Sequence, residues 1–307
     1  MSIAIIISLF IVDFKTFLVG IIIFMFKNYL ILIRWHHWVK NLLIFFPLLL
    51  SFNEYSNLSI INSIYVFIAF CLVASGIYIF NDIKDINLDK NNTRTKNRPI
   101  ASGAISYKTG YILSILFIVL SLSLIILFVP KCLIYIILYI LINILYTMYL
   151  KYLVFFDIIS VSSGFLIRIL AGGIAADIPQ SIWTLLIVSF ASLSLATGKR
   201  LGQLVINPNY LSANWNLMLL KVILLISILF TLLFYGLFSF DSNVALRHES
   251  DIIWISFPII ITIFMRYLYI AWNGIYLGDP TDSILRDKIL QLLAFIWIII
   301  IFYVFII

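Results

Sequence analysis

Long apolar segments recur along almost the whole chain and set the strongest limit on its fold. A helix that crosses a membrane needs about 20 apolar residues in a row, and short polar stretches with Gly, Pro or Asn separate these segments. Of the 307 residues, 64% are hydrophobic and only 11% are charged, whereas about a quarter of a soluble domain is charged. We therefore predict an all-α, polytopic membrane protein with about nine transmembrane helices, at residues 39–53, 60–80, 109–129, 132–150, 154–175, 181–197, 218–239, 252–272 and 288–307.

The first 30 residues form an apolar extension of uncertain role. Asp13 and Lys15 interrupt it, and it has neither the basic start nor the small-residue cleavage site of a secretory signal. Two interpretations stay open, an additional membrane or interfacial helix and an upstream translation start. The rest of the chain, residues 31–307, is expected to form one domain.

Cysteine and histidine give no sign of a zinc site. Cys71 and Cys132 each lie inside an apolar segment and lack a CxxC partner, so we expect them to pack in the interior. His36 and His37 are adjacent, and His248 lies far away, so no metal-ligand spacing joins the three.

Basic residues fall almost entirely on one side of the predicted membrane. With nine helices, the side that carries the loop 81–108 holds fifteen Lys and Arg residues, and the opposite side holds Lys131 and Arg247 only. Cytoplasmic loops are the ones that are rich in Lys and Arg, so we predict that this loop and the polar motifs face the cytoplasm. The net charge of +7 is thus explained by membrane topology, and no nucleic-acid partner is expected.

A regular set of oxygen-bearing side chains lies in this loop. Asn81, Asp85 and Asp89 are four residues apart, which places them on nearly one face of a helix. Such oxygens can bind Mg²⁺, and Mn²⁺ as an alternative. Together with Asp82 they would repel one another without a cation. We predict a metal site formed by Asn81, Asp85 and Asp89; the alternative is a plain polar helix end.

Two basic groups are candidates for binding phosphate. Arg94, Lys96 and Arg98 follow the acidic residues, and Lys199 and Arg200 end a predicted helix. Cations of this kind bind phosphates. The first group is equally typical of contact with anionic lipid, and the second suits the negative end of a helix dipole.

Further candidates lie inside or beside the apolar segments. Arg168 and Arg266 are intramembrane arginines, which usually face a cavity or a partner. Asp157 is a candidate partner or ligand for them, and a buried pair without chemistry is the alternative. The remaining substrate-binding candidates lie near the cytoplasmic surface: Lys40, Asn41, Tyr149 and Lys151.

These motifs together resemble the UbiA superfamily of intramembrane prenyltransferases, whose first aspartate motif matches Asn81, Asp85 and Asp89. The likeness is greatest to its decaprenyl-phosphate phosphoribosyltransferase branch. Five stretches carry it in order: RWHHWVKNLLIFFPLL (34–49), NDIKDINLDKNNTRTKNRPIASG (81–103), DIISVSSGFLIRILAGGIAADIPQSIW (157–183), ATGKR (196–200) and GDPTDSILRDKILQLL (278–293). The resemblance implies a UbiA-like helical bundle whose active site opens to the cytoplasmic face.

One departure bears on the substrate that the resemblance implies. Most of the superfamily has a second DxxxD motif after the sixth helix, but residues 198–217 carry Lys199 and Arg200 and no acidic residue. The resemblance then implies Mg²⁺-dependent transfer of 5-phosphoribose from phosphoribosyl diphosphate (PRPP) to a polyprenyl phosphate, in cell-envelope biosynthesis at a prokaryotic cytoplasmic membrane.

The roles implied are the following. Asn81, Asp85 and Asp89, with Asp82, hold the Mg²⁺–diphosphate. Donor phosphates are neutralised by Arg94, Lys96, Arg98, Lys199 and Arg200. The acceptor phosphate or the ribose is met by Lys40, Asn41 and Arg168. Asp157 holds metal or ribose, and Tyr149, Lys151 and Arg266 complete the substrate-binding set.

Two other functions stay open on the sequence alone. A UbiA-type enzyme that prenylates an aromatic or other small acceptor would need the missing second aspartate motif. A lipid-binding protein or transporter would not release diphosphate from PRPP. The lipid chain length and a homo-oligomeric state are not determined by the sequence.

Overall fold

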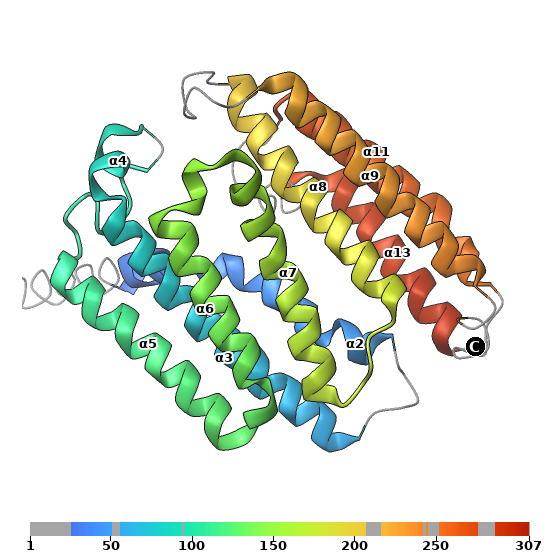
Figure 1. Ribbon diagram of the computed structural model, residues 1–307, viewed down its shortest axis with the longest axis horizontal. Coiled ribbons are helices and arrows are strands. Elements are labelled where there is room, and N and C mark those ends of the chain that lie inside the picture. The colour runs from blue at the N-terminus through green and yellow to red at the C-terminus, as the bar shows by residue number, and fades with distance from the viewer. Residues whose placement is uncertain are drawn as a thin grey trace, which may run out of the picture. The chain divides into compact units, whose positions relative to one another are not determined.

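The computed structural model describes residues 26–50, 56–93, 95–206, 216–241, 244, 252–275 and 286–306. Most of the N-terminal extension, Arg94 and the start of the 278–293 stretch lie outside the described residues. Every regular element in the described part is helical, as predicted (Figure 1). The α-helices are α2 (Phe46–Leu49), α3 (Asn57–Lys84), α4 (Ile86–Asn91), α5 (Tyr107–Phe128), α6 (Leu133–Met148), α7 (Val154–Ala176), α8 (Ile182–Ile206), α9 (Leu217–Phe240), α11 (Phe257–Trp272) and α13 (Lys288–Ile306).

Short 3₁₀ helices join or begin several of these elements. They are η1 (Trp35–Phe45), η2 (Pro130–Cys132), η3 (Leu150–Tyr152) and η4 (Ile253–Ser256). Within the described residues, seven helices are long and apolar enough to cross a membrane, and Lys288–Val304 is a shorter apolar helix. These eight match eight of the predicted spans.

The first predicted span, 39–53, is wrong as an α-helix. Its described residues form the second half of η1 and then the four-residue α2. Asn41 lies inside η1 with 1% of its surface exposed, and its side-chain oxygen accepts a hydrogen bond from Arg168 at 2.6 Å. This tertiary contact ties the segment to α7.

The sixth predicted span, 181–197, is too short. Helix α8 runs nine residues further, to Ile206. The polar residues that suggested its end are satisfied within the protein: the Arg200 guanidinium is buried against Asp157. The helix therefore continues past Lys199 and Arg200.

The chain divides into two compact units. Unit 1 comprises residues 1–38 and 71–121, and unit 2 comprises residues 39–70 and 122–307. In unit 1, a small apolar core joins the α3 end to the 99–105 loop and α5; its buried members are Leu32, Ile79, Ile100 and Ile105. Helices α3 and α5 approach closely at Gly76, whose carbonyl accepts a hydrogen bond from Ser114 Oγ at 2.7 Å.

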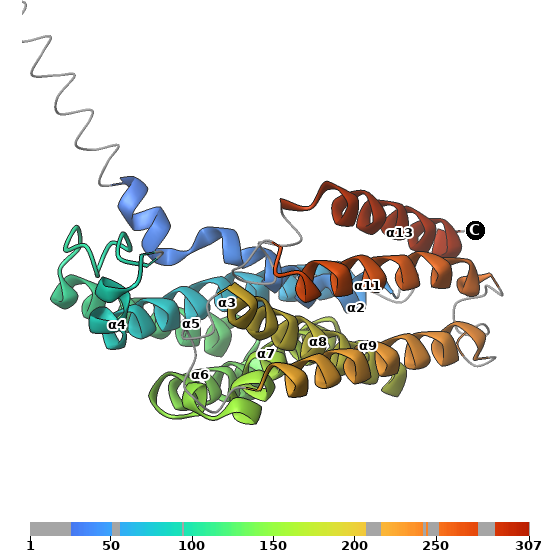
Figure 2. The same cartoon turned by 90° about the horizontal axis from the view of Figure 1, so that it is seen from above.

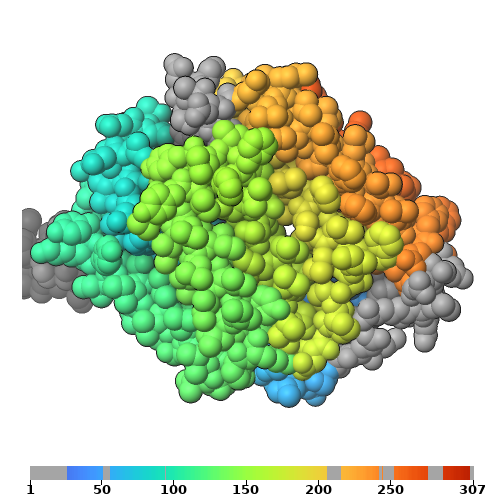
Figure 3. Space-filling model, viewed as in Figure 1, coloured from blue at the N-terminus to red at the C-terminus, as the bar shows by residue number. Residues whose placement is uncertain are grey.

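Unit 2 contains the helices that follow α5. Helices α6, α7, α8 and α9 pack in sequence order and form one face in the space-filling view (Figure 3). Helix α11 packs against both α9 and α13 and lies between them (Figure 2). Adjacent packing of consecutive helices is expected where short connections join antiparallel neighbours.

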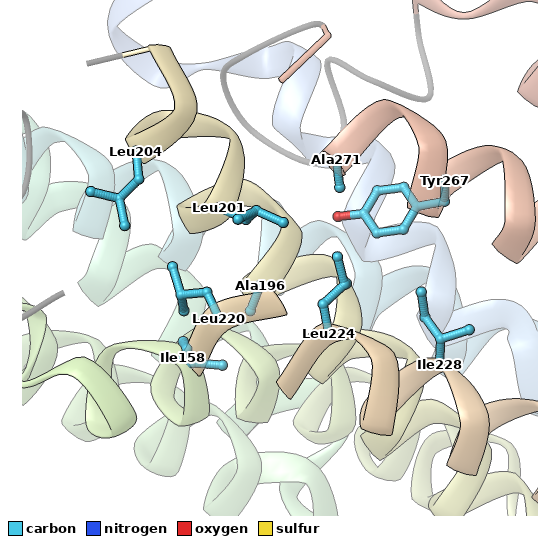
Figure 4. Close-up of a cluster of buried hydrophobic side chains, with 9 residues drawn as sticks. All are labelled: Ile158, Ala196, Leu201, Leu204, Leu220, Leu224, Ile228, Tyr267 and Ala271. Carbon is cyan, nitrogen blue, oxygen red and sulfur yellow. The ribbon is translucent and has the colours of Figure 1, made fainter. Parts of the chain in front are cut away.

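One buried apolar core of unit 2 lies beside the Lys199–Arg200 end of α8. Side chains from α7, α8, α9 and α11 converge there (Figure 4). Tyr267 of α11 donates its hydroxyl to the Leu195 carbonyl at 3.1 Å. Gly198 allows this approach, because a methyl group at that position would come within 2.2 Å of the Tyr267 oxygen. The polar end of α8 is thus fixed by packing on several sides.

Candidate functional site

The acidic motif of unit 1 crosses a break between two helices. Helix α3 ends at Lys84, and Asp85 stands as the N-cap of α4, so the predicted single helix face is interrupted. The helical turns continue nonetheless: the Asp85 N–H donates to the Asn81 carbonyl at 2.9 Å, and the Asp89 N–H donates to the Asp85 carbonyl at 2.8 Å. The four-residue spacing therefore still brings the motif residues onto successive turns.

Two of the acidic side chains are held by arginines. Asp82 and Asp89 have side-chain exposures of 3% and 8%. Arg98 Nη1 lies 3.2 Å from Asp82 Oδ1, and 3.0 Å and 2.8 Å from the two oxygens of Asp89. A second arginine, Arg34, donates to Asp82 Oδ1. The cluster thus contains two carboxylates and two guanidinium groups, and their charges cancel.

Sequence reasoning missed the part that Arg34 takes in this cluster. Arg34 lies 48 residues before Asp82, and in the sequence it counts only toward the excess of basic residues. Its guanidinium also lies over the Tyr78 ring, 4.9 Å from the centroid, in the range of a cation–π contact. Its backbone is left-handed, with φ of 51°, which is uncommon for residues other than glycine. The only sign of this contact in the sequence is that it contains both basic and acidic residues that could pair.

The donor atoms around Asn81 fit a hard divalent cation. Asn81 Oδ1 is buried and has no hydrogen-bond partner among the described residues, which is costly unless a ligand meets it. No three His, Cys, Asp or Glu side chains of the described chain gather into a metal site. Mg²⁺ usually takes only one or two carboxylates and completes its shell with water and substrate phosphates. The Asn81, Asp85 and Asp89 oxygens therefore suit Mg²⁺ in the presence of a phosphate ligand.

Lys96, in the same loop, differs from Arg98 in its exposure and its partners. Lys96 is exposed, and no ion pair joins it to another described residue. Arg94 lies outside the described residues.

A second polar cluster lies in unit 2, where α6, α7 and α8 meet. Arg200 Nε donates to Asp157 Oδ2 at 2.6 Å, and Arg200 Nη2 donates to Asp157 Oδ1. Arg200 also donates to Gln203 Oε1 at 2.7 Å and to Tyr146 Oη at 3.0 Å. Asp157 therefore pairs with Arg200, and its expected pairing with Arg168 or Arg266 is wrong. Lys199, which precedes Arg200 in the chain, is half-buried.

Arg168 is buried among neutral groups. It is 4% exposed, and it donates to Asn41 Oδ1 at 2.6 Å, to the Gly164 carbonyl at 2.5 Å and to Tyr139 Oη at 3.1 Å. Its guanidinium also faces the Tyr139 ring at 4.8 Å. The structure thus brings together two predicted residues, Asn41 and Arg168, and they tie η1 to α7. Lys40, beside Asn41, is half-buried.

Arg266 pairs with an acid that the sequence did not suggest. Its Nη2 lies 2.8 Å from Asp287 Oδ2. Asp287 also caps α13, since its Oδ1 accepts a hydrogen bond from the Leu290 N–H at 2.8 Å. The hydrogen bond from Arg266 and the backbone bond from Leu290 hold the pKa of Asp287 below its usual value, against the opposing effect of burial. This pair is a structural tie between α11 and α13.

The last two predicted residues lie at the connection between α6 and α7. Tyr149 is 61% exposed. The Lys151 ammonium lies over the ring of Tyr152, 5.3 Å from its centroid. Tyr149 is thus exposed and Lys151 half-buried, and both lie at the surface of unit 2.

Comparison with known proteins points to one family. The model of the UbiA prenyltransferase family matches residues 41–201. A decaprenyl-phosphate phosphoribosyltransferase of Mycolicibacterium smegmatis is 32% identical over 290 residues, which cover 87% of this chain and 88% of that protein. A protein of the same name from Corynebacterium glutamicum is 31% identical over 87% of this chain and 83% of its own.

Solved structures show the same fold at lower sequence identity. A UbiA homologue from Archaeoglobus fulgidus, bound to GPP and Mg²⁺, superposes with a TM-score of 0.68 at 17% identity, over 91% of this chain and all of that chain. The UbiA homologue from Aeropyrum pernix superposes with a TM-score of 0.66 at 16% identity, over 87% of this chain and 98% of its own.

Proposed function

Since the chain belongs to the UbiA prenyltransferase family and is thus a transferase embedded in the membrane, we propose that it moves 5-phosphoribose from PRPP to a polyprenyl phosphate. The relatives that share about a third of its sequence over most of their length carry the name of that activity. The residues of both units support the same assignment.

The observation that carries the proposal is the lack of carboxylates at the C-terminal end of α8 and in the residues that follow it. Residues 198–217 contain no acidic residue, and Lys199 and Arg200 stand there instead. Arg200 is bound to Asp157, so the nearby carboxylate of α7 is already neutralised by a fixed cation. A second metal site for a prenyl diphosphate would need carboxylates that this segment lacks.

The acidic cluster of unit 1 is assigned to the diphosphate end of the donor. Asn81, Asp85 and Asp89 would hold Mg²⁺, which neutralises the charge that builds up on the departing diphosphate. Arg98, and Lys96 from the exposed part of the loop, add positive charge for phosphate oxygens. Lys199 is assigned to the remaining donor phosphate, and Arg200 to holding Asp157 and the end of α8 in place.

The reaction needs little more than position and charge. An oxygen of the lipid phosphate attacks C1 of the ribose, the C1–O bond to diphosphate breaks, and diphosphate leaves with the bonding electrons. The attacking phosphate is ionised at neutral pH, so no general base is required. Binding both substrates in line and offsetting the leaving-group charge are the main contributions of the protein.

Arg168 receives a structural role in this account. It lies 14 residues from the start of α7, or about 21 Å along the helix axis, and it holds Asn41 of η1. By the predicted topology this is deep beneath the cytoplasmic surface, where a lipid phosphate does not belong. Lys40 and the surface residues Tyr149 and Lys151 are the better candidates for the acceptor headgroup.

The enzyme is proposed to face the cytoplasm of a prokaryotic cell. The fifteen basic residues on the predicted cytoplasmic side, against two on the other, support this orientation. PRPP is a soluble, strongly anionic donor, so a site open to the cytosol suits it.

A substrate panel tests the proposal. Purified protein is incubated with Mg²⁺ and either PRPP plus polyprenyl phosphates of several lengths or a prenyl diphosphate plus aromatic acceptors. We expect release of diphosphate only with PRPP and a lipid phosphate together, and loss of at least about 100-fold in Asp85→Asn, because the metal site loses a charged ligand. Prenyl transfer to an aromatic acceptor would assign the chain to the general prenyltransferase activity.

A further inference from the structure

Four alternating charges run through the acidic motif of unit 1. Arg34 contacts Asp82, Asp82 contacts Arg98, and Arg98 contacts Asp89. A single nitrogen of Arg98, Nη1, is the donor to both carboxylates, at 3.2 Å to Asp82 and at 3.0 and 2.8 Å to Asp89. Arg98 therefore occupies the same Asp89 oxygens that a metal ion would use.

The two carboxylates would respond differently to the departure of Arg98. Asp82 would keep Arg34 as its partner. Asp89 has Arg98 as its ion-pair partner within the described part of the chain, and its side chain is only 8% exposed. A buried carboxylate that loses its partner is strongly destabilised. A cation must then take the place of Arg98 on Asp89.

The two arginines differ in how firmly they are held. Arg34 has a side-chain exposure of 17% and packs its guanidinium on Tyr78. Arg98 has a side-chain exposure of 30% and belongs to the turns between α4 and α5. Arg98 is thus the member of the cluster that can move to a ligand, and Arg34 is the member that stays.

We propose that Arg98 is an exchangeable counterion of this site. In the metal-free protein it covers Asp89; when donor diphosphate binds, Arg98 moves to a phosphate oxygen and yields Asp89 to the divalent cation. Arg34 is a positioning residue that keeps Asp82 neutralised throughout the exchange. The inference rests on the proposed function, since it concerns the regulation of the same diphosphate site.

The exchange makes metal and diphosphate binding interdependent. Without diphosphate, the cation competes with Arg98 for Asp89, so metal binding is weak. With diphosphate present, Arg98 has another anion to pair with, and the metal binds more tightly. Because binding linkage is reciprocal, the metal must strengthen diphosphate binding by the same factor.

Metal binding without substrates tests this directly. Mn²⁺ binding to the purified full chain is followed by electron paramagnetic resonance in the absence of donor and acceptor. Arg98→Gln removes the competitor and should tighten Mn²⁺ binding by about 10-fold, the size expected for one charge-assisted contact. The matched control is Lys90→Gln, which removes one positive charge from α4 beside Asp89 in the chain; its side chain is exposed and screened, so a change within about threefold is expected.

Inorganic diphosphate supplies the second arm of the experiment. At a fixed concentration of free Mn²⁺, diphosphate should tighten Mn²⁺ binding in the wild type and in Lys90→Gln. In Arg98→Gln this coupling should fall by about the factor that Arg98→Gln adds without diphosphate, because the competing arginine is already gone and only direct contact between metal and phosphate remains. Asp89→Asn should remove the effect of Arg98→Gln when the two changes are combined.

The possible results separate the exchange from the proposed function. Equal or weaker Mn²⁺ binding in Arg98→Gln, or an effect no larger than that of Lys90→Gln, overturns the exchange even if PRPP turnover is normal. Tighter binding in Arg98→Gln supports it even if another substrate replaces PRPP. If Arg98→Gln does not fold, Arg98→Lys keeps one charge without the guanidinium fork; it should still tighten Mn²⁺ binding by roughly threefold, and no change there counts against the exchange.

Discussion

Lys199 and Arg200 are neighbours in the chain, yet their surroundings give them different tasks. Arg200 is buried and makes a two-point contact with Asp157, whose side chain is 1% exposed. Lys199 occupies the preceding position of α8 and is half-buried. The ion pair is a structural element, and the lysine remains the candidate for a donor phosphate.

Alanine at each of these two positions should therefore affect different measurements. Lys199→Ala should raise KM for PRPP by about 10- to 100-fold, from the loss of one charge-assisted contact, with little change in melting temperature. Arg200→Ala leaves Asp157 buried without a partner, a loss of about 3–5 kcal/mol, and should lower the melting temperature in detergent by roughly 10 °C. The double variant Asp157→Asn/Arg200→Gln should recover part of that stability. An unchanged melting temperature in Arg200→Ala would contradict the structural role.

Residue spacing predicted the helical turns of the acidic motif, but not the partners of its side chains. Asn81, Asp85 and Asp89 are four residues apart, and local helical turns preserve that spacing; their binding of a metal stays a prediction. The Arg34–Asp82 contact spans 48 positions and the Arg168–Asn41 contact spans 127. Such pairings depend on the tertiary packing of helices, which residue spacing within one segment does not contain.

At the scale of elements, η1 shows how packing overrides an apolar pattern. The sequence 39–53 reads as a membrane helix, but its described part packs as a 3₁₀ helix and a short α-helix. A methyl group on Gly172 of α7 would come within 2.1 Å of the Ile44 carbonyl oxygen, so the backbones of η1 and α7 are almost in contact. The long apolar helices elsewhere, apart from the C-terminal end of α8, were predicted to within a few residues because burial in lipid requires their length.

Alanine substitution at glycine tests this close approach. Gly172→Ala should destabilise the protein by about 1–3 kcal/mol, because the backbone of Ile44 must shift to admit the methyl group. Gly236→Ala in α9 is the matched control, since its nearest neighbour would be a flexible Phe257 ring atom at 3.3 Å. We expect that control to be neutral or slightly stabilising. Equal melting temperatures for the two variants would contradict the tight η1–α7 contact.

The start of α13 should be sensitive to acid. The pKa of Asp287 is lowered in the folded protein, chiefly by the Arg266 hydrogen bond. Its contribution to stability is therefore present above the pKa of the unfolded chain, about 3.9, and is lost as the pH falls through the folded value. Asp287→Asn keeps a capping oxygen but loses the ion pair, so thermal unfolding of this variant should depend less on pH below about 4. Asp287→Ala should lose the cap as well, at about 1 kcal/mol more; identical pH profiles for Asp287→Asn and wild type would contradict the pairing.

At the scale of the whole molecule, the distribution of charge predicts how the chain lies in the membrane. By the predicted topology, the acidic motif and the Lys199–Arg200 pair both lie on the cytoplasmic side. Ser56 precedes α3 and Asn97 follows α4, and both are exposed. In a background without Cys71 and Cys132, Ser56→Cys should react with an impermeant thiol reagent from outside spheroplasts, and Asn97→Cys only after lysis. Labelling of both from one side would show that the span order is wrong.

The central claim is that the ribose phosphate, and not a prenyl group, is transferred. PRPP labelled in the ribose carbons and, with a second isotope, in the β-phosphate follows the two halves of the donor separately. With Mg²⁺ and a polyprenyl phosphate, the ribose label should enter the lipid extract while an equal amount of the β-phosphate label appears as free diphosphate. Absence of ribose label from the lipid, together with transfer from a prenyl diphosphate to a small acceptor, would contradict the account.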